Sequence, residues 1–318
     1  MTDPLEPIPS RHRSSAYQPI PAGARVPPLW ALPLILVVFF AAAAAVLLVL
    51  GLGLAVLGRM PGGDPADLDW RMAAGATVVA LMVMFAVVMA WILKFERRPL
   101  GSAGMGRFDP APTVPWFLLG LAFALITSLA IAYGTGAESE VDALPRAIGD
   151  PVRLLLAGVV VAVIMLPNSL VEELLFRGWA LSAIARRRGI MPAVVITSLA
   201  FGAAHVPPWQ WAEPARLLSF ISYSAVGVGF AAMALRTRAL YAPIAFHTGF
   251  NTLLITGALA DSGMDPNRLL ETITNSPLGT ENITEAAVWL VVNLFFAGAM
   301  IWWWRQRPEE PTPASVFE

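Results

Sequence analysis

The sequence predicts an all-α membrane protein, a polytopic bundle of about eight transmembrane helices. Its composition carries this prediction. Of 318 residues, 57% are hydrophobic and only 14% are charged, whereas soluble domains contain about 25% charged residues. The mean hydropathy of +0.66 indicates that lipid surrounds most of the chain. The net charge of −1 gives no reason to expect a nucleic-acid partner.

Eight apolar runs account for the predicted helices. A helix needs about 20 apolar residues to cross roughly 30 Å of hydrocarbon. The runs lie at 29–58, 72–94, 115–135, 152–184, 191–207, 217–235, 239–259 and 284–304. The fifth run is short and ends at Pro207 and Pro208, because proline disrupts a helix interior.

The basic residues indicate that both termini lie in the cytoplasm. Cytoplasmic loops of membrane proteins are enriched in Lys and Arg. With the N-terminus inside, eight spans leave fourteen Lys and Arg residues on the cytoplasmic side and six on the other. The remaining basic residue, Arg177, lies inside a span. An odd number of spans would break this alternation.

Composition also divides the chain into segments. Residues 1–28 are polar and rich in proline, so we expect a disordered tail there. The first three spans contain almost no ionisable residues, which favours a scaffold at 29–151. Ionisable residues appear in later spans, which favours a functional core at 152–260. An outer loop with the last span at 261–304, and a tail at 305–318, complete the chain.

Span 4 contains three ionisable residues close together, and a charge at a helix centre costs about 2.5–3.5 kcal/mol on insertion scales. Glu173 and Arg177 are four residues apart and can pair on one face, so they could simply hold helices together. Glu172 is rotated about 100° from Glu173 and has no local partner. An unpaired carboxylate in a membrane is expensive, so Glu172 is the stronger functional candidate.

Two of the three histidines lie in the predicted core. His205 ends the stretch FGAAH, while His247 and Asn251 are four residues apart and project to one side of their helix. Taken singly, His205 could be an interfacial hydrogen-bonding residue, and the other two could form an interhelical polar contact. Gly202 and Gly249 leave room for neighbouring helices to approach closely.

Together these side chains suit the hydrolysis of a peptide bond. A glutamate with a histidine can hold and deprotonate a water, and a second histidine with an amide can stabilise an oxyanion. Equally, Glu172, His205 and His247 are a plausible zinc ligand set with an open water position. The residues alone do not choose between these versions. The absence of cysteine excludes thiolate nucleophiles and cysteine-bound metals.

Three short motifs occur in order on separate spans. Residues 172–177 match EExxxR, residues 201–205 match FxxxH, and residues 247–251 match HxxxN. In this order and spacing they resemble the CAAX prenyl endopeptidase and bacteriocin-processing family (CPBP, Abi or Rce1-like) of intramembrane proteases. The resemblance covers about residues 150–260, and the family's archaeal and eukaryotic members share the eight-helix architecture.

The resemblance implies a role for each matched residue. Glu172 and His205 would activate water, His247 and Asn251 would stabilise the oxyanion, and Glu173 with Arg177 would support the site. The metal-free version is favoured, so no cofactor is expected. If a metal is present, zinc on Glu172, His205 and His247 is the alternative.

The expected function is an intramembrane endopeptidase that cleaves a membrane-associated peptide or protein. The expected location is the lipid bilayer of the cell membrane, as a multi-pass protein of a bacterial inner membrane. A non-catalytic immunity or binding protein of the same family is one alternative. A polytopic transporter is another, but it predicts inverted repeats, which the sequence does not show.

Overall fold

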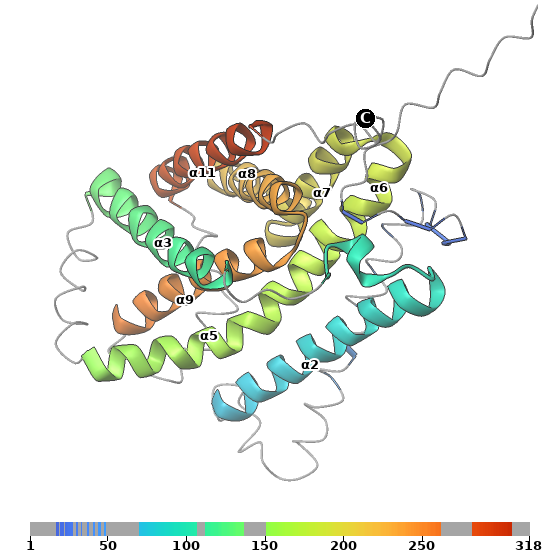
Figure 1. Cartoon of the computed structure of the whole chain (residues 1–318). Helices are drawn as coiled ribbons and strands as arrows, with labels where there is room; N and C mark the ends of the chain where they lie inside the picture. Colours follow the sequence, from blue (N-terminus) through green and yellow to red (C-terminus); the bar gives the residue numbers. More distant parts are fainter. Residues whose placement is uncertain are drawn as a thin grey trace, which may run out of the picture.

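The computed structural model describes residues 70–106, 112–136, 151–261 and 282–306, with single positions and short stretches between 17 and 48. Within these residues the chain forms helices and connecting turns, and no strand (Figure 1). The all-α prediction is therefore confirmed.

The helices follow the apolar runs closely. Their bounds are α2 (Trp70–Ala90), α3 (Thr113–Thr135), α5 (Pro151–Glu173), α6 (Leu181–Arg188), α7 (Ile190–His205), α8 (Pro214–Thr237), α9 (Tyr241–Asp261) and α11 (Ile283–Arg305). Shorter turns extend or connect them: η2 (Trp91–Phe95), η3 (Leu100–Ala103), η4 (Leu174–Ala180) and η5 (Pro208–Gln210). Through η4, a π-helical segment, α5 continues into α6 without interruption.

Five helices in the described part of the chain are long and apolar enough to cross a membrane. They cover residues 74–95, 113–135, 151–188, 214–237 and 283–305. Helix α7 is apolar but has only 16 residues, as the proline pair predicts. The predicted first span, 29–58, falls largely outside the described residues. The count of eight spans and the cytoplasmic location of both termini therefore stay predictions.

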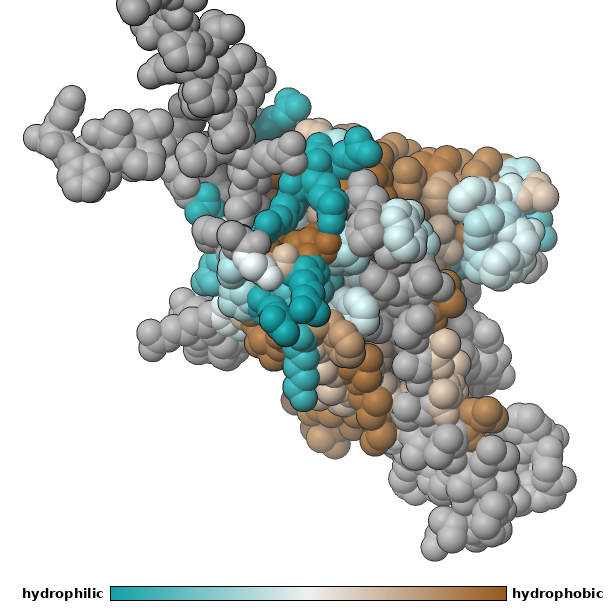
Figure 2. Space-filling model, turned by 90° about the vertical axis from the view of Figure 1, so that its right-hand side faces the viewer, coloured by the Kyte–Doolittle hydropathy of each residue, from teal (hydrophilic) through white to brown (hydrophobic). Residues whose placement is uncertain are grey.

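The helices that carry the predicted site residues lie beside one another. Helix α8 packs against α7 and α11, while α9 packs against α3 and α5 (Figure 1). Of the five candidate spans, α8 is the most buried. The outer helices instead expose apolar side chains, such as Leu155, Val163 and Phe295. Figure 2 shows broad hydrophobic areas on one face, as a lipid-facing surface requires.

Glycines allow two of these contacts to be close. A Cβ on Gly249 would lie 2.2 Å from the Phe117 carbonyl oxygen, and one on Gly120 would lie 2.1 Å from that of Phe246. Helices α3 and α9 thus touch through their backbones. A Cβ on Gly202 would likewise meet the Phe220 carbonyl oxygen of α8 at 2.8 Å. The close approach predicted at Gly202 and Gly249 is confirmed.

Part of the predicted N-terminal tail is packed on the helices. The Tyr17 side chain is buried, with 3% of its surface exposed, and its hydroxyl donates to the Arg177 carbonyl oxygen at 2.7 Å. The sequence pattern did not predict this contact, because Arg177 lies 160 residues away in the chain. Residues 1–16 lie outside the described residues, so the expectation of disorder stays a prediction there.

Candidate active site

A cavity of about 350 Å³ lies among the helices of the predicted core. All four residues predicted to be catalytic line it: Glu172, His205, His247 and Asn251. They come from the end of α5, the end of α7 and the first half of α9. The tertiary structure thus brings together residues that the sequence places on three separate spans.

Glu172 lies between the two histidines. Its Oε2 atom is 3.8 Å from His205 Nε2 and 3.9 Å from His247 Nε2. Both distances are too long for direct hydrogen bonds. Oε2 is buried and has no hydrogen-bond partner among the described residues. Polar atoms at such separations are commonly joined by a bridging water.

Asn168 holds the other oxygen of the same carboxylate. Its Nδ2 donates to Glu172 Oε1 at 3.1 Å. The two residues are four apart on α5 and therefore lie on one helix face. Asn168 also lines the cavity. Asn168 is not among the site residues predicted from the sequence, although its four-residue spacing from Glu172 is a signal that points to it. With Oε1 held, Oε2 remains the oxygen that faces the two imidazole rings.

The orientation of His205 is fixed by its own helix and by α8. Its Nδ1 lies 2.9 Å from the Phe201 carbonyl oxygen, which can only accept, so Nδ1 carries the hydrogen. The ring stacks on Tyr223, with centroids 4.3 Å apart and planes at 22°. Nε2 is therefore the nitrogen presented to Glu172. Tyr223 had no signal in the sequence, because its role depends on how α7 and α8 pack.

Glu173 is shared by two partners. Its Oε1 accepts from Arg177 Nη1 at 3.1 Å and from His247 Nδ1 at 3.1 Å. The Glu173 and Arg177 side chains are 0% and 1% exposed. The Arg177 guanidinium also lies 4.1 Å from the centroid of the Phe201 ring. The predicted ion pair is confirmed, and Glu173 additionally orients His247 so that its Nε2 faces Glu172.

The helix geometry is unusual where these residues lie. Helix α5 ends at Glu173, and the next seven residues form the π-helical segment η4. Such segments are rare and occur frequently at functional sites. Arg177 lies within η4, and every residue of η4 is buried. The EExxxR motif therefore spans the junction between the two helix types, which residue spacing alone could not predict.

Helices outside the predicted core also contribute to the cavity. Leu81 and Met84 come from α2 and Trp289 from α11. Trp289 is 2% exposed, and its indole nitrogen has no acceptor among the described residues. Most of the other lining residues are apolar. The polar groups therefore face a space that is largely walled by hydrocarbon.

The zinc alternative can be compared with this geometry. Within the described ranges, no group of three or more His, Cys, Asp and Glu side chains is placed to hold a metal ion. Ligand atoms on a tetrahedral zinc lie about 3.3–3.4 Å apart, given zinc–nitrogen bonds near 2.0–2.1 Å. The separations of 3.8 and 3.9 Å around Glu172 Oε2 are longer. The metal-free version stays a prediction.

Comparison with known proteins supports the motif assignment. Residues 152–253 match the family model described as "Type II CAAX prenyl endopeptidase Rce1-like". These residues form an Rce1-like domain. The chain is also 28% identical over 202 residues to the "Putative membrane peptidase YdiL" of Bacillus subtilis (strain 168). The aligned residues cover 61% of this chain and 76% of that protein. No solved structure matches the chain.

The Rce1-like domain contains all six predicted site residues, from Glu172 to Asn251. The family resemblance predicted from the three motifs is therefore confirmed. Tyr223 and Asn168 also lie inside the matched region, whereas the cavity residues of α2 and α11 lie outside it.

Proposed function

We propose that this protein is an intramembrane endopeptidase that hydrolyses a peptide bond of a membrane-associated protein or peptide. One observation carries the proposal: Glu172 Oε2 has no hydrogen-bond partner in the described part of the chain and faces the Nε2 atoms of His205 and His247 at 3.8 and 3.9 Å. The match of residues 152–253 to an endopeptidase family supports it. So do the apolar helices around the site, because a substrate must reach it from the membrane.

In the proposed reaction, a water bound between Glu172 Oε2 and His205 Nε2 is the nucleophile. Its oxygen bonds to the carbonyl carbon of the substrate while its proton passes to Glu172. The carbonyl π electrons move onto the oxygen. When the tetrahedral intermediate collapses, the carbon–nitrogen bond breaks and Glu172 returns the proton to the leaving amine. Asn168 keeps the carboxylate aligned through both steps.

His247 and Asn251 stabilise the oxyanion in this scheme. The Nδ1–H of His247 donates to Glu173, which holds the ring with Nε2 facing the cavity, where it would contact the carbonyl oxygen of the substrate. Asn251 lies one turn later on α9 and lines the same cavity, where its amide is a second donor. Donors fixed in a largely apolar cavity stabilise developing charge more strongly than donors in water.

Replacement of Glu172 by alanine tests the proposal. Membrane proteomics would compare cells carrying the wild-type protein with cells carrying Glu172→Ala. A membrane-associated substrate is expected to accumulate uncut in the variant, while the variant itself remains folded and inserted. Glu213→Ala is the matched control, because Glu213 is exposed and lies outside the cavity.

The two outcomes are distinct. Loss of cleavage in Glu172→Ala, but not in Glu213→Ala, supports the endopeptidase. Full cleavage by Glu172→Ala would overturn the assignment. Identical fragment patterns in cells with and without the protein would favour the non-catalytic immunity or binding protein.

A further inference from the structure

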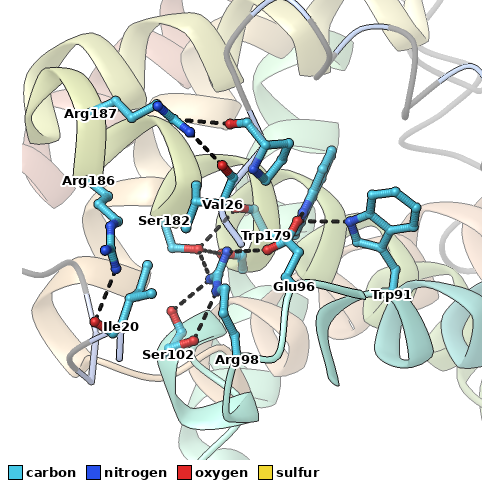
Figure 3. Close-up of polar contacts among 12 residues, drawn as sticks. Ile20, Val26, Trp91, Glu96, Arg98, Ser102, Trp179, Ser182, Arg186 and Arg187 are labelled. Carbon is cyan, nitrogen blue, oxygen red and sulfur yellow. Dashed lines mark hydrogen bonds and ion pairs between the residues drawn. The ribbon is translucent and has the colours of Figure 1, made fainter. Parts of the chain in front are cut away.

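An N-terminal strap lies against the segment that carries Arg177. We use this term for the described residues 17, 18, 20, 21 and 23–27. Figure 3 shows Arg186 reaching the Ile20 carbonyl oxygen, at 3.0 Å, and Arg187 reaching that of Val26. Arg187 also donates to the Pro27 carbonyl oxygen at 3.1 Å. The arginines at the end of α6 thus bind the backbone of the strap.

A buried polar cluster lies beside the strap and connects it to η4. Arg98 Nη1 pairs with Glu96 Oε2 at 2.9 Å, and both side chains are almost fully buried. The indole nitrogen of Trp179, in η4, donates to the other Glu96 oxygen, and Arg98 also donates to Ser182 (Figure 3). The strap joins this cluster through the Arg25 backbone N–H, which donates to the Glu96 carbonyl oxygen at 2.8 Å.

The segment η4 packs closely against η3, next to the strap. A Cβ on Gly178 would lie 2.8 Å from the Ala103 carbonyl oxygen, so η3 and η4 touch through their backbones. The Tyr17 ring lies next to Gly104, which adopts a φ of +77° at the end of η3. Tyr17 thus inserts where η3 and η4 meet.

The Tyr17 side chain is hydrogen-bonded to the backbone of Arg177. Its hydroxyl donates to the Arg177 carbonyl oxygen at 2.7 Å. Burial raises the pKa of the Tyr17 phenol, so the hydroxyl stays protonated and remains a donor. From Arg177 the contacts continue through its guanidinium to Glu173 and from Glu173 to His247, each at 3.1 Å.

We propose that Tyr17 is a positioning residue for the active site: by holding the Arg177 carbonyl in η4, it fixes the Glu173 carboxylate under His247. This inference rests on the proposed function. Tyr17 touches neither the cavity nor the reacting atoms, so its effect is on the alignment of the oxyanion donor. An interaction that matters in the transition state alone changes kcat and leaves KM unchanged.

Tyr17→Phe tests this proposal, because it removes the hydroxyl and keeps the ring. Tyr241→Phe is the matched control, since Tyr241 also donates to a backbone carbonyl, that of Gly106, at 2.7 Å. The assay uses the purified full chain and a quenched fluorescent peptide built on the cleavage sequence found in the Glu172→Ala comparison. Hydrogen exchange of residues 174–182, measured by mass spectrometry, is the second measurement.

Tyr17→Phe should lower kcat about two- to tenfold, the effect of one hydrogen bond, with KM unchanged. Exchange at 174–182 should rise in this variant and stay at the wild-type level in Tyr241→Phe. Unchanged kcat and unchanged exchange in Tyr17→Phe would overturn the positioning role. Equal losses of kcat in both tyrosine variants would also overturn it.

Glu172→Ala separates the failure of this inference from failure of the proposed function. If Glu172→Ala abolishes cleavage while Tyr17→Phe behaves as wild type, the positioning role alone is wrong. If Glu172→Ala retains cleavage, the endopeptidase mechanism is wrong. In that case the exchange measurement still tests whether Tyr17 holds η4.

Discussion

Glu172 and Glu173 are adjacent in the chain but lie in different surroundings. Glu172 faces the cavity, and its Oε2 has no hydrogen-bond partner among the described residues. Glu173 is fully buried between Arg177 and His247. The helical rotation of about 100° per residue separates them. One residue type thus supplies both the proposed base and the group that orients the second histidine.

Glu173→Ala should reduce both folding yield and activity. It leaves Arg177 buried without its carboxylate and removes the acceptor of His247 Nδ1. Breaking a buried ion pair by removing one partner costs about 3–5 kcal/mol. Size-exclusion chromatography and thermal unfolding in detergent would measure the yield and the melting temperature.

Glu213→Ala provides the control for that substitution, because Glu213 is exposed and its side chain makes no capping hydrogen bond to α8. Its melting temperature should match that of the wild type. A Glu173→Ala protein that melts like the wild type would contradict a stabilising role for the ion pair.

At the scale of elements, glycines set the distances between the helices that carry the site. Helices α3 and α9 approach through Gly120 and Gly249. Gly249 lies between His247 and Asn251 in the HxxxN motif. The contact that fixes α9 against α3 therefore occurs on the same turn that presents both proposed oxyanion donors. Helix packing and site geometry are coupled at this position.

Gly249→Ala should lower the melting temperature and the activity together. The added Cβ would meet the backbone of Phe117 at 2.2 Å, and backbone cannot move aside as a flexible side chain can. Gly257→Ala, on the same helix, is the matched control, since a Cβ there has none of the described atoms within 4 Å. That control should be neutral or slightly stabilising, because alanine favours helix by up to about 1 kcal/mol over glycine.

Differential scanning fluorimetry of the two glycine variants would measure the difference. Equal melting temperatures for Gly249→Ala and Gly257→Ala would show that the α3–α9 contact does not depend on the missing side chain.

At the scale of the whole molecule, the site is enclosed by more than the Rce1-like domain. Residues from α2 and α11 complete the apolar wall of the cavity, and the N-terminal strap contacts η4 through the hydrogen bond from Tyr17 to Arg177. The domain at 152–253 thus supplies the polar groups of the site. Segments before and after it supply apolar lining residues and the hydrogen bond to η4.

Active protein purified without added metal should contain no stoichiometric zinc. In the metal-free mechanism, Glu172 and His205 activate water without a metal ion, so chelation should leave the cleavage rate unchanged. Elemental analysis of the full chain, paired with activity before and after chelation, would measure this. One zinc per chain, together with activity lost on chelation and restored by zinc, would overturn the metal-free version.

The sequence by itself determined the apolar helices of the described residues, the Glu173–Arg177 pair and four of the residues that line the cavity. The length of an apolar run indicates the length of a helix, and a spacing of four residues indicates that two side chains share a helix face. Both are local properties, so they could be read from the chain directly. The three motifs then associated Glu172, His205, His247 and Asn251 through the family resemblance, before any distance between them was known.

Only the tertiary structure decided which groups support these residues. Glu173 meets His247 across 74 positions of sequence, Trp179 meets Glu96 across 83, and Tyr17 meets Arg177 across 160. Arg98 pairs with Glu96, and both side chains are almost fully buried. The local sequence pattern does not predict such contacts, because they depend on how separate helices pack. The chain alone therefore revealed the proposed catalytic groups, and the fold revealed what holds them in place.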